Sequence, residues 1–291
     1  MRFVPPLSLL MTIMALSLMS PLPASSAPSA DTVTSFLGEE LTPPPLPAEV
    51  AAEMEVKLAS ARSEYDADPE DAEATIWLGR RLGYLGRYTE AIEVFSKGLE
   101  LHPGDARLYR HRGHRYITTR QLDNAIADLE SAAGLVAGRE DEVEPDGLPN
   151  ALGIPTSTLQ SNIWYHLGLA RYLSGDFAGA LEAYRESLEV SGNPDMLVAT
   201  SHWLYMTLRR LNQVDEAAEV LKAISPDMEI IENGDYHRLL LFYRGDMTAE
   251  DILPDTGDDL SSSTTGYGVG NWYLYNGRTG EAERVFRKIL Q

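Results

Sequence analysis

Residues 164–188 read WYHLGLARYLSGDFAGALEAYRESL, and this stretch decides the fold. Gly168 is followed twelve residues later by Ala180 and sixteen residues later by Tyr184. Gly175 lies between them, where two short helices would turn, because glycine adopts a left-handed backbone at little cost. The stretch therefore predicts two antiparallel helices that approach closely where their side chains are small.

The same offsets of twelve and sixteen residues recur at four other places in the chain. In each place a small or aromatic residue is followed by an alanine and then by a large apolar residue, with a turn residue seven positions after the first. These sets are Gly79, Gly86, Ala91 and Phe95; Gly113, Arg120, Ala125 and Leu129; Tyr205, Asn212, Ala217 and Leu221; and Gly270, Gly277, Ala282 and Phe286. Such units bury their apolar faces only when they stack, so we expect an all-α array of antiparallel helical hairpins.

The spacing between units locates an insertion. The interval from Gly79 to Gly113 gives the length of one unit, about 34 residues, which is a period typical of helical-hairpin arrays. The interval from Gly113 to Gly168 is longer than one such unit by about 21 residues. This excess predicts an insertion at residues 134–160.

A longer interval indicates a degenerate unit. The distance along the chain from Tyr205 to Gly270 is about 65 residues, which is close to two units of this period. We therefore expect a degenerate unit at about residues 231–254, and about six units within residues 69–291. The apolar periodicity of residues 48–68 predicts an N-terminal helix that caps the first unit.

The repeated motifs resemble the tetratricopeptide repeat family. Trp164-x-x-Leu167-Gly168, followed by Ala180 and Tyr184, carries the strongest resemblance, and the similarity runs from about Glu70 to the C-terminus. Residues 108–117 and 202–211 also resemble an exported bacterial subgroup of this family. The resemblance implies a right-handed superhelix in which the first helix of each hairpin lines the concave face.

The N-terminal residues 1–27 predict a secretory signal peptide. They contain one positive charge at Arg2, an apolar stretch at residues 7–19 and small residues around Ser26. The apolar stretch is short for a membrane span, although an uncleaved anchor is the alternative. We expect a periplasmic or secreted protein with no membrane span after cleavage, and a proline-rich tether at residues 28–47.

The composition excludes several classes of function. The chain has 44 acidic and 24 basic residues and a net charge of −20, which argues against nucleic acid as a partner because phosphate binding needs a basic surface. It has no cysteine, so disulfides, thiolate metal sites, cysteine nucleophiles and a lipid-modified cysteine are excluded. The chain contains no P-loop, nucleophile-elbow or zinc-protease motif. We therefore expect no catalytic residues, no cofactor and no metal.

Charge is unevenly distributed among the predicted helices. Four first-helix windows contain no acidic residue, yet they hold eleven of the 24 basic residues and four of the six histidines. The windows are residues 74–88, 107–120, 160–175 and 196–214. This pattern predicts a basic concave face inside a strongly acidic protein.

Helical spacing selects the side chains that would line this face. They are Trp77, Arg80 and Tyr84 in the first unit; Arg107, Arg110, His111 and His114 in the second; Asn162, Tyr165, His166 and Tyr172 in the third; His202, Trp203, Arg209 and Arg210 in the fourth; and Tyr267 and Asn271 in the last. Arginine makes bidentate contacts with carboxylates, and flat aromatic rings stack on peptide groups. We therefore expect one groove that binds an acidic segment or a C-terminal carboxylate of a protein partner.

Other interpretations of the same residues stay open. The arginines and aromatic side chains can be structural, because first helices are the more enclosed helices of such an array. The acidic insertion, with Glu140, Asp141, Glu142, Glu144 and Asp146, can itself fold into the groove. The aromatic rings also suit a glycan or peptidoglycan fragment, and an enzyme with an unrecognised site is a lesser alternative.

Overall fold

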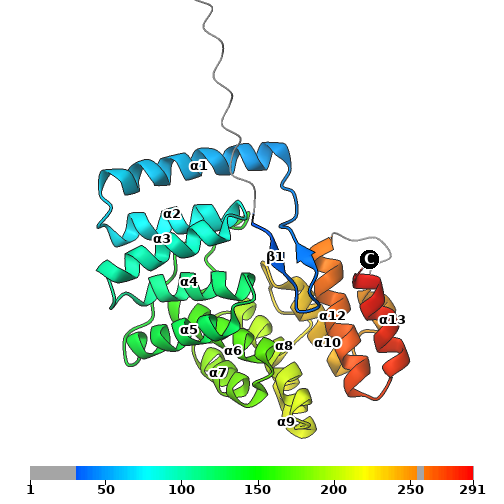
Figure 1. Ribbon diagram of the computed structural model, residues 1–291. Coiled ribbons are helices and arrows are strands. Elements are labelled where there is room, and N and C mark those ends of the chain that lie inside the picture. The colour runs from blue at the N-terminus through cyan, green and yellow to red at the C-terminus, as the bar shows by residue number, and fades with distance from the viewer. Residues whose placement is uncertain (1–30, 254–258, 291) are drawn as a thin grey trace, which may run out of the picture.

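The computed structural model describes residues 31–253 and 259–290, which form a stack of antiparallel helical hairpins (Figure 1). The predicted signal peptide lies outside these residues. The paired helices are α2 (Ala72–Tyr84) and α3 (Tyr88–Leu101); α4 (Ala106–Thr118) and α5 (Leu122–Val136); α6 (Leu159–Ser174) and α7 (Phe177–Glu189); α8 (Pro194–Arg210) and α9 (Val214–Val220); α10 (Gly234–Arg244) and α11 (Ala249–Ile252); and α12 (Asp259–Tyr275) and α13 (Thr279–Ile289). The predicted all-α array of hairpins is confirmed.

The close approaches between paired helices occur at the predicted small residues. A β-carbon placed on Gly168 of α6 would lie 2.6 Å from Cε1 of Tyr184 on α7, so only glycine allows this packing distance. All five predicted turn positions have a positive φ angle, including the two that are not glycine, Arg120 at 61° and Asn212 at 60°. The repeated residues of the sequence are therefore the ones at which the two helices of each hairpin make close contact and at which the chain turns between them.

The N-terminal part of the described chain packs on the first hairpin. Helix α1 (Ala48–Ala67) runs along α2 and buries Leu58 and Ala61 (Figure 1). Before it, the short strands β1 (Val33–Thr34) and β2 (Glu40–Leu41) pair antiparallel within the segment that we expected to be a tether. Asp31 ties the start of this segment to α3: its carboxylate accepts from Thr89 N, and its own N–H donates to Gly86 O.

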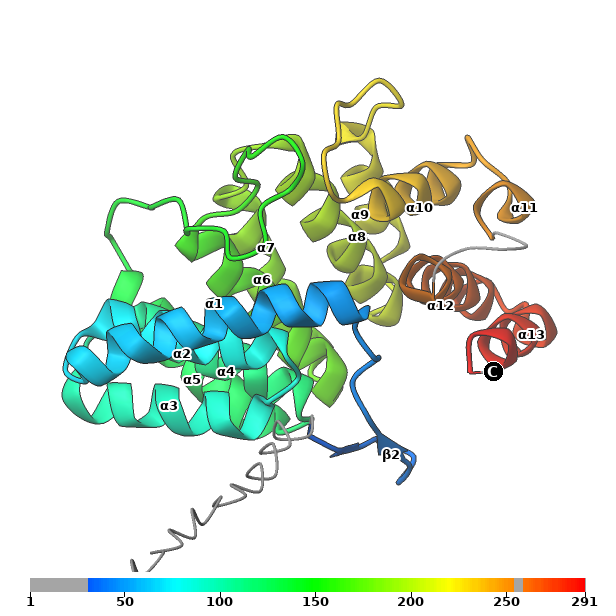
Figure 2. The ribbon, with the colours of Figure 1, turned by 90° about the horizontal axis from the view of Figure 1, so that it is seen from above.

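The segment between α5 and α6 covers one side of the array. It runs from residue 137 to residue 158, and Val143 pairs with Thr158 in an isolated antiparallel bridge. Leu159 N donates to Glu142 O at 2.9 Å, which closes the stem of the loop beside the start of α6. Seen from above, this loop and the loop that follows α9 lie on the same side of the molecule (Figure 2).

The C-terminal hairpins share one aromatic core with the middle of the chain. Tyr172 of α6 and Tyr275 of α12 are 103 residues apart, yet their hydroxyl oxygens lie 3.1 Å from each other. Trp272 of α12 packs on Phe242 of α10 with ring centroids 4.8 Å apart. The array therefore curls until its last hairpin contacts α8 and α6. Among the described residues, no helix combines the length and apolar character needed to cross a membrane.

Candidate functional site

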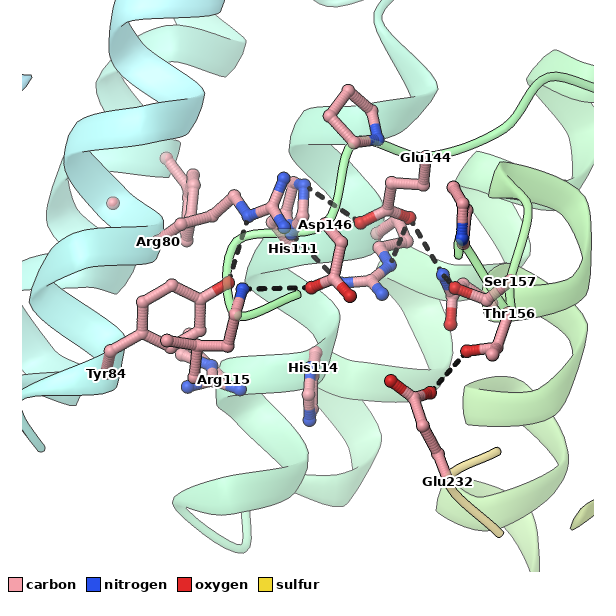
Figure 3. A pocket seen from close by; sticks show the side chains of 17 residues that line it. Arg80, Tyr84, His111, His114, Arg115, Glu144, Asp146, Thr156, Ser157 and Glu232 are labelled. Atoms are coloured by element: carbon pink, nitrogen blue, oxygen red, sulfur yellow. Dashed lines mark hydrogen bonds and ion pairs between the residues drawn. The ribbon is translucent and has the colours of Figure 1, made fainter. Parts of the chain in front are cut away.

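A cavity of about 250 Å³ opens between α2, α4, α6 and the loop that precedes α6 (Figure 3). Three guanidinium groups line it, those of Arg80, Arg110 and Arg115, and we call it the arginine cavity. The concave helices also contribute Tyr84, His111, His114 and Asn162. The covering loop contributes Glu144, Asp146, Thr156 and Ser157, and Glu232 closes one edge.

The helical repeat explains how these side chains meet. Arg110 and His114 lie one turn apart on α4 and therefore point in the same direction. Arg80 and Tyr84 have the same spacing on α2, and Arg80 Nε donates to the Tyr84 hydroxyl at 3.3 Å. Asn162 stands near the start of α6, which begins after a capping box at Thr158. Consecutive units thus bring their first helices to one site.

Glu144 of the loop is buried against the floor of the arginine cavity. Its Oε2 lies 3.0 Å from Nε of Arg110 and accepts a hydrogen bond from Asn162 Nδ2 at 3.0 Å (Figure 3). Its Oε1 lies 3.5 Å from Nε2 of His111. Only 8% of Arg110 and 8% of Glu144 is exposed. The Arg110–Glu144 contact is an ion pair by distance, although the angle at Nε does not meet hydrogen-bond geometry and leaves that N–H without a partner.

Three guanidinium groups and three carboxylates line the cavity, and few of them are paired with one another. Burial lowers the pKa of Arg110; Glu144 opposes this change and Arg80 adds to it. Burial, with repulsion from Arg110, lowers the pKa of Arg115 to about 10, so Arg115 stays protonated at neutral pH. Within the described ranges neither Arg80 nor Arg115 forms an ion pair. Arg80 and Arg115 thus have no ion-pair partner in the part of the chain that the structure describes, and neither do the carboxylates of Asp146 and Glu232 at the same cavity, so these two guanidinium groups are the ones available to an anionic ligand.

The histidines of the cavity are neutral. Burial lowers the pKa values of His111 and His114 well below the usual range, and nearby arginines lower them further. His166 packs on His114 with ring centroids 4.3 Å apart, and burial lowers its pKa to about 3. Across the part of the chain that the structure describes, no three His, Asp or Glu side chains gather as metal ligands.

A second hollow of about 340 Å³ lies between α8, α10, α12 and α13. We call it the aromatic pocket, because its walls are the rings of His202, Trp203, Tyr236 and Tyr267. Ser263 and Thr264 add hydroxyl groups, Ile289 and Leu290 close one side, and no charged residue lines it. His202 stacks on Tyr236 with centroids 4.7 Å apart, and burial lowers the pKa of His202 to about 3.

Comparison with known families agrees with this architecture. Residues 72–115 and residues 161–194 each match a model described as the tetratricopeptide repeat. The chain contains tetratricopeptide repeats.

Several known proteins are similar to this chain. The heat-shock protein cognate (HSC) co-chaperone sgt12 of Aspergillus fumigatus is 27% identical over 132 residues; the match covers 45% of this chain and 32% of the co-chaperone, about a third of its length. A crystal structure of MamA superposes with a TM-score of 0.46 and 20% identity, covering 60% of this chain and 82% of MamA. A crystal structure of YrrB gives a TM-score of 0.45 and 17% identity, covering 79% of this chain and 90% of YrrB.

The tetratricopeptide repeat array divides the predicted groove into two hollows. Arg80, Tyr84, Arg110, His111, His114 and Asn162 line the arginine cavity. His202, Trp203 and Tyr267 line the aromatic pocket. Tyr165, His166, Tyr172 and Asn271 are packed between or behind these hollows and line neither. The single groove that we expected is therefore corrected to two separate sites.

Two of the predicted arginines turn away from both hollows. Arg209 donates to the Tyr205 hydroxyl at 2.9 Å and to Tyr275 O at 3.2 Å, so it ties α8 to the end of α12. Arg210 lies over the ring of Phe177, 4.6 Å from its centroid. The expectation that this pair shares a cavity with Arg110 and His114 is wrong, because they lie on the last turn of α8, where the C-terminal hairpin folds back.

Two predicted side chains of the first repeats also have internal partners. Arg107 pairs with Glu73 at 2.8 Å and with Asp105 at 2.7 Å, and these contacts raise its pKa. Trp77 donates from Nε1 to Glu73 at 2.9 Å, and Arg80 lies 4.5 Å from its ring centroid. Neither Arg107 nor Trp77 lines the arginine cavity, so both contacts support the structural interpretation for these positions.

Several residues of the two hollows were not among the predicted set, and four of them show why. Arg115 lies in the acid-free window 107–120, so the charge pattern of the sequence could have identified it. Glu144 belongs to the acidic insertion, which could be predicted as a possible occupant but not as this one side chain. Glu232 and Tyr236 come from the degenerate unit, where the repeat pattern is too weak to assign a face.

Proposed function

We propose that this chain is a non-enzymatic interaction scaffold that binds a protein partner on the concave face of its tetratricopeptide repeats. The observation that carries the proposal is the arginine cavity, where Arg80 and Arg115 have no carboxylate partner among the described residues. Charged hydrogen bonds to a carboxylate are among the stronger polar contacts that a protein makes. The ligand we propose is therefore an acidic segment or a C-terminal carboxylate.

The proposed partner contacts both hollows. Tyr165 is packed between them: its ring contacts His166, and its hydroxyl lies 3.5 Å from that of Tyr236, which lines the aromatic pocket. An acidic residue in the first hollow and an apolar side chain in the second are compatible with one bound segment. The similarity to a protein named as a co-chaperone supports an interaction role in general terms.

Export is part of this proposal. Residues 1–27 have the composition of a signal peptide, so we place the scaffold in the periplasm or outside the cell. The N-terminus of the mature protein, determined by mass spectrometry, should lie between Pro23 and Ala30. Recovery of a cytoplasmic chain that retains Met1 would contradict export and leave the binding proposal unaffected.

Partner capture tests the binding proposal. The protein should retain a partner from an envelope extract, identified by mass spectrometry, and the purified complex should weaken as ionic strength rises. Replacing both Arg80 and Arg115 with Gln should weaken binding by about tenfold or more, since each charged hydrogen bond contributes about 1.5–3 kcal/mol. The matched control is Arg185→Gln, which removes an exposed arginine of α7 that pairs with Glu216. Equal affinity of the double variant and this control would contradict the proposal.

A glycan ligand is the second candidate, because the aromatic pocket combines stacking rings with two hydroxyl groups and has no charged wall. Sugar stacking depends little on salt, so binding that persists at high ionic strength would favour it. Tyr267→Ala should then abolish binding, whereas the Arg80 and Arg115 replacements should leave it unchanged.

A further inference from the structure

The loop over the arginine cavity buries an acidic side chain and exposes apolar ones, which is the reverse of the usual arrangement. We call residues 144–157, the part beyond the Val143–Thr158 bridge, the lid. The lid buries the carboxylate of Glu144, while its apolar side chains face solvent: Leu148 is 46% exposed, Leu152 is 66% exposed and Ile154 is 49% exposed. A loop that served only to close a core would bury its leucines and expose its acid. This reversal points to a role for the buried acid.

The surroundings of Glu144 are those of a bound ligand. It touches Arg110 and His111 of α4 and Asn162 of α6, residues of two different repeats on the concave face. Pro145 follows it, and a residue before proline is held in an extended conformation. Gly147 then passes so close to Tyr84 that a β-carbon there would overlap the Tyr84 hydroxyl. Glu144-Pro145-Asp146 thus enters the site, and the chain bends at Gly147.

The lid is attached by polar contacts at its edges. Arg81 donates to Gly147 O at 2.9 Å, and Asn193 donates to Thr156 O at 2.9 Å. Glu232 accepts from Asn150 Nδ2 at 3.0 Å and from the Thr156 hydroxyl. All of these bonds can be exchanged for bonds to water, because the groups lie near the surface. The stem at Val143 and Thr158 can stay closed while the lid moves.

We propose that the lid is an internal stand-in for the partner, with Glu144 in the place of the partner's carboxylate, and that binding displaces it. This inference rests on the proposed function and names its ligand more closely: an extended segment with a glutamate followed by proline and a second acid. An occupant on the same chain acts at an effective concentration of about a millimolar. A competitor can bind only the molecules in which the lid has left the site. Its apparent dissociation constant is therefore its intrinsic dissociation constant divided by the fraction of such molecules.

A peptide that copies the lid is the direct probe. We would label the peptide EVEPDGLP, which is residues 142–149, and measure its binding to the full chain by fluorescence anisotropy. In one variant Asn-Gly replaces the whole lid; these two residues form a tight turn that joins paired strand positions such as Val143 and Thr158. In a second variant Glu144→Gln keeps the lid and removes only the charge.

The expected result is an order of affinities. The variant without the lid and the Glu144→Gln variant should both bind the peptide about tenfold or more tightly than the unaltered chain. Glu140→Gln, an exposed acid outside the lid, is the matched control and should bind as the unaltered chain does. A peptide with Gln in place of its second glutamate should bind none of them well. Far-ultraviolet circular dichroism would check that each variant is folded.

The outcomes separate this inference from the function on which it rests. If the folded lid-free variant binds the peptide no more tightly than the unaltered chain, Glu144 is not a stand-in and the inference is overturned. Partner capture that depends on Arg80 and Arg115 would survive that result. If the lid-free variant loses a partner that the unaltered chain captures, the lid is part of the binding surface, which also overturns displacement.

Discussion

Gly168 is the residue at which two helices of one repeat come closest. A methyl group there would stand 2.6 Å from the ring of Tyr184, which is fully buried. Because backbone and ring must separate to admit it, Gly168→Ala should lower the free energy of unfolding by about 1–3 kcal/mol. Urea denaturation followed by circular dichroism measures this change.

Gly134 provides the matched control for that substitution. It lies inside α5 and faces solvent, and no atom stands within 4 Å of the place that a β-carbon would occupy. Gly134→Ala should raise the free energy of unfolding by about 0.5–1 kcal/mol, because alanine loses less backbone entropy on folding. Equal destabilisation at both positions would show that helix crossing distance does not govern the packing.

His202 makes stability depend on pH. Burial lowers its pKa to about 3, against about 6.5 in an unfolded chain. Between these values only the unfolded chain binds the proton, so this contribution is complete above about pH 6.5 and is lost as the pH falls. The loss for one such histidine is about 2 kcal/mol at pH 5.

The variant His202→Gln isolates that effect, because it removes the group whose protonation favours unfolding. The stability difference from the unaltered chain should narrow by about 2 kcal/mol between pH 7.5 and pH 5. Urea titrations at both pH values give the difference. A gap that stays constant with pH would mean that His202 is protonated in the folded state as readily as in the unfolded one.

At the scale of elements, Asp195 holds the loop that borders the arginine cavity. It is the second residue of α8, and its carboxylate accepts backbone hydrogen bonds from Ile231, Glu232 and Asn233 at 2.7–3.2 Å. Asp195→Ala should lower the free energy of unfolding by about 2 kcal/mol, since three partly buried N–H groups would lose a charged acceptor. It should also speed hydrogen exchange in the lid, because Glu232 anchors Asn150 and Thr156.

Asp227 is the control on the same loop. It is exposed, so Asp227→Ala should change stability by less than about 0.5 kcal/mol. Lid exchange should also stay at the rate of the unaltered chain. If Asp195→Ala left lid exchange equally unchanged, the loop would not position Glu232.

Elements differ in how far the sequence predicts them. Helix pairing was predictable because each crossing needs a small residue opposite a large one, as at Gly168 and Tyr184, and this requirement recurs with a fixed period. The faces of single helices followed from the same register, which is why Arg80, Arg110 and Asn162 were correctly placed together. The positions of the lid side chains could not be predicted in this way, because the conformation of a loop depends on its particular side-chain contacts and has no helical period.

The whole molecule explains why one predicted groove became two. The sequence pattern describes each repeat and its neighbours, whereas the positions of Arg209 and Tyr172 depend on how strongly the array curls. Curling brings Tyr275 close to both Arg209 and Tyr172. Arg209 Nη2 lies 3.2 Å from the carbonyl oxygen of Tyr275, and the hydroxyl oxygens of Tyr172 and Tyr275 lie 3.1 Å apart. Contacts between repeats that are not adjacent are set by the sum of many small rotations, which no single motif encodes.

This closure predicts that the two ends of the array contribute differently to its stability. A chain that ends at Leu253 loses α12 and α13, and with them the Trp272 ring that packs on Phe242 and the contacts from Tyr275 to α6 and α8. These rings pack against the core that α8 shares, so amide exchange in α8 should become markedly faster. A chain that begins at Glu70 loses α1, which buries Leu58 and Ala61 against α2. There the amides of α2 should exchange faster while those of α8 keep their protection.

Hydrogen exchange measured by mass spectrometry on both truncated chains tests this prediction. Equal loss of α8 protection in the two truncated chains would describe an array that unfolds as one unit. Full α8 protection in the chain that ends at Leu253 would mean that the contacts made by curling contribute nothing to stability.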